Sequence, residues 1–109
     1  MQIMATKNYV FRVFAYKDVD GTFTAVCLDL DIIEEGFSTL QQAVLSINEA
    51  IDSHLMAVTR RGFPKELLNR PAPKEYWDKL KEFTRPTSFS TTPFQYFTAT
   101  TEGRHQLYA

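Results

Sequence analysis

Four carboxylates stand close together in the sequence and are the first candidates for chemistry. Asp29, Asp31, Glu34 and Glu35 lie within seven residues, where an apolar segment gives way to an amphipathic one. Carboxylates gathered in this way can hold divalent metal ions for phosphodiester cleavage, or can present a negative surface to a basic protein. A solvated sheet edge is the third interpretation, because edge strands often carry charges that discourage unwanted pairing.

The spacing of these carboxylates tests the metal-site interpretation. A two-metal nuclease needs acidic side chains that converge from separate elements onto ions about 3.5–4 Å apart. Asp29 and Asp31 would share one face only if that stretch is extended, whereas Glu34 and Glu35 point to opposite faces of any strand containing both. We therefore expect recognition rather than catalysis, with no metal or cofactor, and assign partner binding to Asp29, Asp31, Glu34 and Glu35.

The other reactive residue types are isolated. Cys27 is the single cysteine and lies in an apolar segment without a basic neighbour, which indicates an inert core thiol. His54 and His105 have no second ligand at metal-binding spacing. The four glycines are scattered and form no phosphate-binding loop.

Charge is unevenly distributed along the chain. The formal net charge is −1, but residues 1–55 carry three Lys/Arg against eight Asp/Glu, and residues 56–109 carry nine against five. The near-neutral total argues against bulk electrostatic binding to nucleic acid. The asymmetry itself is compatible with chance placement of solvated charges, or with an acidic surface for a basic partner.

Length and composition indicate one folded domain. The chain has 109 residues, of which 44% are hydrophobic and 14% aromatic, enough for one modest core. The first residues lack the basic start and apolar run of a signal peptide, and no window resembles a membrane span. We expect a cytoplasmic protein.

Three strands are expected in the first third of the chain. Residues 8–16 are rich in aromatic and β-branched residues on both faces, and only Arg12 breaks the second face, which is typical of a central strand covered on both sides. Asp20-Gly21 is a hairpin signal, and residues 22–28 form the returning strand. A short third strand at residues 32–35 should end at Gly36.

A long amphipathic helix is expected at residues 39–61. Thr39 with Gln42 forms a capping box, and Gly62 is a suitable residue to follow the C-terminus. The apolar residues recur at three- and four-residue spacing and form one stripe suited to lying on a sheet: Leu40, Ala43, Val44, Ile47, Ile51, Leu55 and Val58.

The remaining chain predicts two further elements. Pro64 can open a single turn, residues 74–84 form a short helix, residues 84–92 read as a loop, residues 93–100 form a strand, and the end is a loose tail. We expect an α+β domain with a three- to four-stranded, mainly antiparallel sheet and the long helix on one face. Residues 1–62 form its core, and residues 63–109 are an extension of the same domain.

Aromatic residues in the extension predict self-association. One long helix cannot easily cover them, so a homo-oligomer is expected. They are Tyr76, Trp77, Phe94, Tyr96 and Phe97.

The first half of the chain resembles the HicB family, the antitoxins of HicA–HicB toxin–antitoxin pairs. The resemblance rests on a strand, the turn Asp20-Gly21, the strand end Cys27-Leu28-Asp29-Leu30, Gly36, and the helix start Thr39-Leu40-Gln41-Gln42-Ala43. Leu28 replaces a common Pro, and Gln41 and Gln42 replace two Glu. Family members that repress their own promoters carry a C-terminal DNA-binding motif, which nothing after Gly62 matches, and this argues against DNA binding.

The resemblance implies a partial RNase H-like fold without nuclease activity. It implies an antitoxin that binds a small, basic, HicA-like toxin that degrades mRNA, and family members often oligomerise through strands. Two alternatives remain open. One is a HicB-like domain without a toxin that acts as an oligomeric binding module. The other is a metal-dependent nuclease using Asp29, Asp31 and nearby acids.

Overall fold

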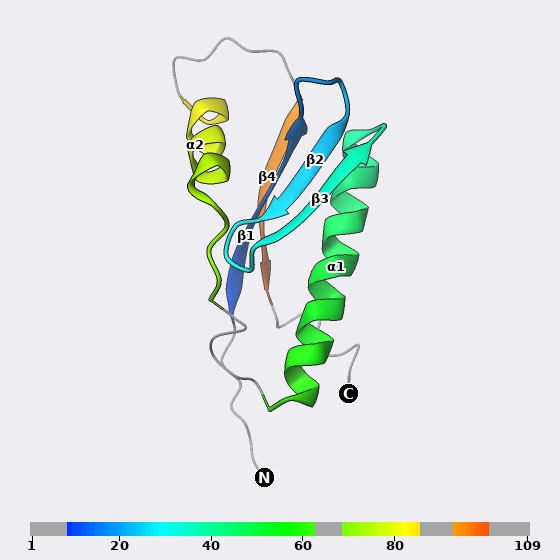
Figure 1. The fold of residues 1–109 in the computed structure, drawn as a ribbon, viewed down its shortest axis with the longest axis vertical. Helices are drawn as coiled ribbons and strands as arrows, with labels where there is room; N and C mark the ends of the chain where they lie inside the picture. Colours follow the sequence, from blue (N-terminus) through cyan, green and yellow to red (C-terminus); the bar gives the residue numbers. More distant parts are fainter. Residues whose placement is uncertain (1–8, 63–68, 86–92, 101–109) are drawn as a thin grey trace.

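The computed structural model describes residues 9–62, 69–85 and 93–100. Within them the elements follow the order β1 (Val10–Lys17), β2 (Phe23–Cys27), β3 (Ile32–Phe37), α1 (Leu40–Arg60), α2 (Lys74–Phe83) and β4 (Phe94–Thr100). The strands form an antiparallel sheet in the spatial order β3-β2-β1-β4. Helix α1 packs on one face and α2 on the other (Figure 1). The expected α+β fold is confirmed.

Strand β1 is the centre of the sheet, as its sequence indicates. It pairs with β2 and with β4, and both its faces are covered. Phe11, Val13 and Ala15 point toward α1, whereas Phe14 and Tyr16 point toward α2, all of them buried. A strand covered on both sides needs apolar residues at consecutive positions, which explains its nearly uninterrupted apolar sequence.

The β1–β2 connection is held by the turn residues that predicted it. The backbone N–H of Gly21 donates to the carbonyl of Asp18 at 3.1 Å, and Gly21 has φ +89°. The Asp20 carboxylate accepts hydrogen bonds from the backbone N–H and the hydroxyl of Thr22, at 2.9 and 2.6 Å. Glycine adopts this left-handed backbone without the Cβ clash of other residues, so the chain can reverse here.

Strand β3 runs longer than expected. It was predicted to end at Gly36, but it continues through Gly36 to Phe37. The pairing register shifts because three steps from Glu34 to Phe37 on β3 match two steps from Ala25 to Phe23 on β2. Gly36 has φ +87° and absorbs the extra residue, so this glycine marks a β-bulge and not a strand end.

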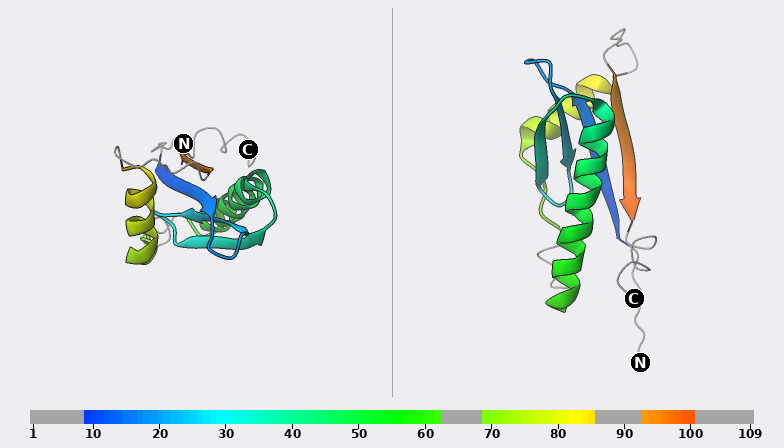
Figure 2. Two further views of the ribbon diagram at one scale, coloured as in Figure 1. Left: turned by 90° about the horizontal axis from the view of Figure 1, so that it is seen from above. Right: turned by 90° about the vertical axis from the view of Figure 1, so that its right-hand side faces the viewer.

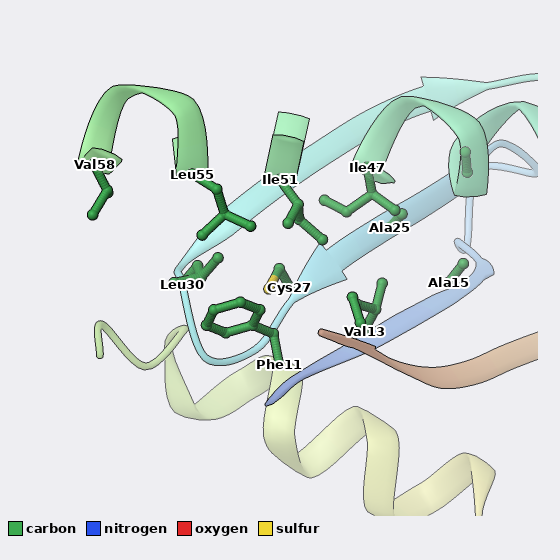
Figure 3. Packing of buried hydrophobic residues seen from close by; sticks show 12 residues of the cluster. Phe11, Val13, Ala15, Ala25, Cys27, Leu30, Ile47, Ile51, Leu55 and Val58 are labelled. Carbon is green, nitrogen blue, oxygen red and sulfur yellow. The ribbon is translucent and has the colours of Figure 1, made fainter. Parts of the chain in front are cut away.

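Helix α1 lies along the sheet on the face that its apolar stripe predicts. Thr39 caps it by accepting a hydrogen bond from the backbone N–H of Gln42 at 3.1 Å, and Gly62 follows its end with φ +82°. Figure 3 shows the helix side chains facing residues of β1 and β2 and the turn after β2. The buried helix residues are Ala43, Ile47, Ile51, Leu55 and Val58. Burying each larger aliphatic side chain stabilises the fold by about 1.5–3 kcal/mol.

Helix α2 covers part of the opposite face, and Figure 2 shows the sheet between the two helices. The segment before it is tied to the β2–β3 turn, since the N–H groups of Arg70 and Ala72 donate to the carbonyls of Asp29 and Leu28 at 2.9 and 2.8 Å. The helix packs through four partly buried side chains: Tyr76, Trp77, Leu80 and Phe83. The predicted apolar stripe of this helix therefore contacts the chain's own sheet.

The boundaries of α1, α2 and β4 agree with the sequence expectations to within one residue. Most of the turn opened by Pro64, most of the loop at residues 84–92, and the C-terminal tail lie outside the described residues.

Candidate functional site

The four predicted carboxylates lie in and around β3, which is the outermost strand at one end of the sheet. Asp29 and Asp31 belong to the turn between β2 and β3, while Glu34 and Glu35 lie within β3. The stretch from Asp29 to Asp31 is therefore not extended, and these two side chains do not share a strand face. The structure brings the four residues to one edge but gives each a different environment.

Arg12 holds Asp29 in place at the edge of the core. Its Oδ2 accepts hydrogen bonds from the backbone N–H and the Nε of Arg12 at 2.7 and 3.1 Å, and its Oδ1 accepts one from Nη2 at 2.7 Å. The guanidinium also lies over the Trp77 ring, 4.6 Å from its centre. The Asp29 side chain is only 18% exposed. Asp29 therefore links β1, the β2–β3 turn and α2.

The contact between Asp29 and Arg12 shifts the pKa values of both groups. Burial alone would raise the pKa of Asp29, but the hydrogen bonds and charge of Arg12 outweigh it, so the pKa lies below its ordinary value. The same hydrogen bond raises the pKa of Arg12. Both groups stay charged near neutral pH, and their charges largely cancel. Asp29 consequently adds little to a negative surface.

Asp31 is exposed and begins the edge. Among the residues that the structure describes, Asp31 is the one non-glycine residue with a positive φ, at +55°. Asp and Asn tolerate this left-handed conformation better than most residues, because their short polar side chains can bond locally. The turn thus places an exposed carboxylate immediately before β3.

Glu34 and Glu35 project to opposite sides of β3, as the strand period predicts. Glu34 lies on the α1 side, where its Oε1 accepts a hydrogen bond from the Ser46 hydroxyl at 2.7 Å. Glu35 is exposed, and its charge acts on Tyr16 and Tyr76 on the α2 side. The edge therefore carries a carboxylate on each side of its backbone.

The α2 side of this edge is negative beyond Glu35. Burial raises the pKa of Tyr76, and the carboxylates of Glu75, Glu35, Asp18 and Asp31 raise it further. Lys79 offsets part of this charge, because its Nζ lies 4.0 Å from Asp18. We call the carboxylates on both sides of β3 and next to it the acidic edge. They are Asp31, Glu34, Glu35 and the neighbouring Asp18 and Glu75.

The other reactive residues are placed as follows. Cys27 is fully buried in β2 and packs in the core between the sheet and α1. His54 lies on α1 and is partly buried. Within residues 9–62, 69–85 and 93–100, no group of three or more His, Cys, Asp and Glu side chains could hold a metal ion.

The aromatic residues expected to drive self-association divide into two sets. Tyr76 and Trp77 pack on the sheet through α2, and Phe97 packs against the core beneath α1. Phe94 and Tyr96 are 38% and 43% exposed and lie in β4, the outermost strand at the other end of the sheet. This second edge was not separated from the other aromatics by sequence reasoning, because only the sheet order distinguishes them.

Arg12 is the residue whose role sequence reasoning missed. A signal was present, because Arg12 alone interrupts the apolar pattern of β1. A charged residue among apolar neighbours is stabilised by a partner of opposite charge, and Asp29, which lies 17 positions away, supplies it.

Comparisons with family models, curated proteins and solved structures found no match to this chain. Among the described residues, no helix is both long enough and apolar enough to cross a membrane.

Proposed function

We propose that this protein is a HicB-like antitoxin, a cytoplasmic binding protein that neutralises a small basic mRNA-degrading toxin by direct contact. One observation carries the proposal: β3 is an edge strand with carboxylates on both of its sides and Asp31 at its start. The element order β-β-β-α supports it, since the sequence resemblance to HicB implies the same order.

The acidic edge suits a basic partner for two physical reasons. Carboxylates on both sides of one strand accelerate encounter with a positive surface and orient it, because charge complementarity acts mainly on association. The outer backbone groups of an edge strand can also pair with an extended segment of a partner. Lys or Arg side chains flanking such a segment would meet Glu34 on one side and Glu35 on the other.

The test is the association rate with a basic toxin encoded beside this protein. Asp31→Asn combined with Glu35→Gln removes two exposed charges from the acidic edge. Glu49→Gln combined with Glu82→Gln is the matched control, because it removes two exposed charges from α1 and α2. The first pair should slow association several-fold at low ionic strength and flatten its salt dependence, and the control should not.

Surface plasmon resonance at two ionic strengths measures both effects. Equal association rates for the two double variants would assign the carboxylates to a solvated edge without a partner. Absence of any adjacent gene for a small basic protein would favour the toxin-free oligomeric module, which the exposed aromatics of β4 also support.

The nuclease alternative makes a distinct prediction. Asp29 is engaged by Arg12 and Glu34 by Ser46, and Glu35 lies on the opposite side of the strand from Glu34. These carboxylates do not converge on a common point, so we expect no cleavage of RNA or DNA with magnesium or manganese. Turnover that Asp29→Asn abolishes would replace the binding proposal with a catalytic one.

A further inference from the structure

Helix α2 leaves part of its face of the sheet uncovered beside β4. Phe14 on β1 is buried beneath α2, and Tyr96 lies opposite it on β4. Arg12, two residues before Phe14, and Thr98, which lies opposite Arg12, therefore share the α2 side. Tyr96 is 43% exposed, Thr98 is exposed, and the Arg12 side chain is 48% exposed. Together with Phe94 they form an uncovered strip, which we call the β1–β4 face.

Two aromatic rings follow one another on this face. Phe94 and Tyr96 are two residues apart on β4, so their Cα atoms are about 7 Å apart and their side chains share one side of the strand. Phe94 is held by edge-to-face contacts with Phe14 and Phe83, at 6.1 and 5.4 Å between ring centres, and is still 38% exposed. Exposed rings in a row on a sheet are a surface on which the unstacked bases of a single strand can stack.

An arginine lies between these rings and α2. The Arg12 guanidinium lies over the Trp77 ring, 4.6 Å from its centre, and its side-chain bonds to Asp29 use Nε and Nη2. A guanidinium has five N–H donors, so Nη1 can donate to a phosphate oxygen without breaking the pair with Asp29. Arg12 can therefore bind an anion while it keeps its structural contact.

The side of α2 that borders the β1–β4 face is basic. Residues three and four apart on a helix are neighbours, so Lys74 and Lys81 lie on the same side as Trp77, which contacts Arg12. Asp78 pairs with Lys74 at 2.8 Å, which leaves the charge of Lys81 in excess. Strand β4 contributes no charged residue, and the acidic edge lies on the other side of α2. The face is therefore locally positive, although the net charge of the chain is −1.

We propose that the β1–β4 face binds single-stranded nucleic acid. Its bases stack on Phe94 and Tyr96, and its phosphates contact Arg12 and Lys81. The combination of rings and cations selects this occupant. Rings alone would accept any apolar segment, whereas a single strand offers exposed bases to the rings and phosphates to the cations. A basic peptide would meet like charge at the same place.

This inference does not rest on the proposed antitoxin function. The acidic edge lies at β3, and β4 is at the opposite end of the sheet, so the two surfaces can be occupied separately. Binding of an oligonucleotide is measured without a partner protein. Failure of either proposal therefore leaves the other intact.

Fluorescence anisotropy of a labelled oligonucleotide measures binding to the full chain. The probe is a single-stranded RNA of about ten nucleotides, within the usual site sizes of single-strand-binding domains, compared with DNA of the same sequence and with inorganic polyphosphate. Tyr96→Ala should weaken binding at least about fivefold, as expected for the loss of one stacked base, and Tyr96→Phe should recover most of that loss. Leu45→Ala is the matched control, since Leu45 is a 58% exposed apolar residue on α1, and it should bind like the wild type.

The salt dependence of binding tests the role of the cations. Lys81→Gln should reduce the slope of log affinity against log salt concentration by about 0.7, the value for one phosphate contact of a single strand. Lys17→Gln is the matched control, because Lys17 is exposed and the strand period places it on the α1 side of β1. Trp77 is the single tryptophan of the chain, so quenching of its fluorescence on binding would locate the strand beside α2.

Each outcome decides the proposal. Saturable binding of RNA, of DNA or of both supports it and identifies the kind of strand. No saturable binding of either oligonucleotide at low ionic strength would overturn it, as would an unchanged affinity of Tyr96→Ala. Equally tight binding of polyphosphate would also overturn it, because polyphosphate has charge but no bases. A dimer that buries Tyr96 and binds neither oligonucleotide would assign the face to a second copy of the chain instead.

Discussion

The two edges of the sheet occupy equivalent places in the fold but carry opposite chemistry. Strand β3 has carboxylates on both sides and a bulge at Gly36, whereas β4 is regular, neutral and partly aromatic. Both are outermost strands, so topology alone gives each a backbone edge beyond which no strand lies in the described sheet. The difference teaches that side chains decide which kind of partner an edge admits. Charge favours a complementary surface, and a neutral flat strand favours another neutral strand.

The largest effect is expected from a core substitution that disrupts both edges of the sheet together. Ile47 is fully buried between α1 and the sheet, and Ile47→Asp would place an unpaired carboxylate in the core. Such burial costs several kcal/mol, comparable to the whole stability of a domain of this size. We expect loss of cooperative unfolding in circular dichroism, and with it loss of association with a basic partner and of any self-association. Retention of either interaction would show that the edges do not depend on this core.

A second change, at Asp29 beside the acidic edge, separates structure from recognition. Asp29→Asn should lower the free energy of unfolding by about 1–2 kcal/mol, because it removes a charged partner from a half-exposed pair that solvent screens. The association rate with a basic partner should change little, since Arg12 already neutralises Asp29. A slower association than that of Asp31→Asn would return Asp29 to the recognition surface.

The pairing of Asp29 with Arg12 predicts that the free energy of unfolding depends on pH. The pKa of Asp29 is lower in the folded protein than its ordinary value of 3.8. A lowered carboxyl pKa contributes stability that is present above the ordinary value and is lost as the pH falls through the folded value. The wild type should therefore lose stability below about pH 4 more steeply than Asp29→Asn. Urea unfolding at neutral pH and near pH 3 measures the difference.

A smaller effect is expected at one edge alone. Gly36 has φ +87°, a conformation in which other residues are strained although no atom crowds a Cβ there. Gly36→Ala should cost about 1 kcal/mol and loosen β3 without loosening β4. Faster amide exchange confined to β3 would agree with this expectation. Equal loosening of β4 would show that the two edges are coupled through the sheet.

The smallest effect is expected at Lys79, which borders the acidic edge beside Asp18. Lys79 lies over the Tyr16 ring at 4.9 Å and 4.0 Å from Asp18. Lys79→Gln should lower stability by about 0.5 kcal/mol, since exposed ion pairs and cation–π contacts contribute little. Thermal unfolding measures this loss, and the association rate with a basic partner should change little. A marked change in association with a basic partner would show that Lys79 masks the charge of Asp18 within the acidic edge.

The sequence by itself determined the elements and most of their boundaries. The double-sided apolar pattern of β1, the stripe and Thr39 cap of α1, and the turn at Gly21 act over a few residues, so local periodicity and backbone sterics suffice to predict them. The opposite directions of Glu34 and Glu35 followed from the two-residue period of a strand. The end of β3 was misjudged because a glycine in a bulge and a glycine at a strand end look alike in sequence.

Only the tertiary structure decided which residues are free to meet a partner. Arg12 and Asp29 are far apart in the chain, and their pairing depends on how the β2–β3 turn packs beside β1. The order β3-β2-β1-β4 sets Phe94 and Tyr96 at an edge while Trp77 is partly covered. Strand order and long-range ion pairs are chosen by the packing of the whole core, which no local pattern encodes.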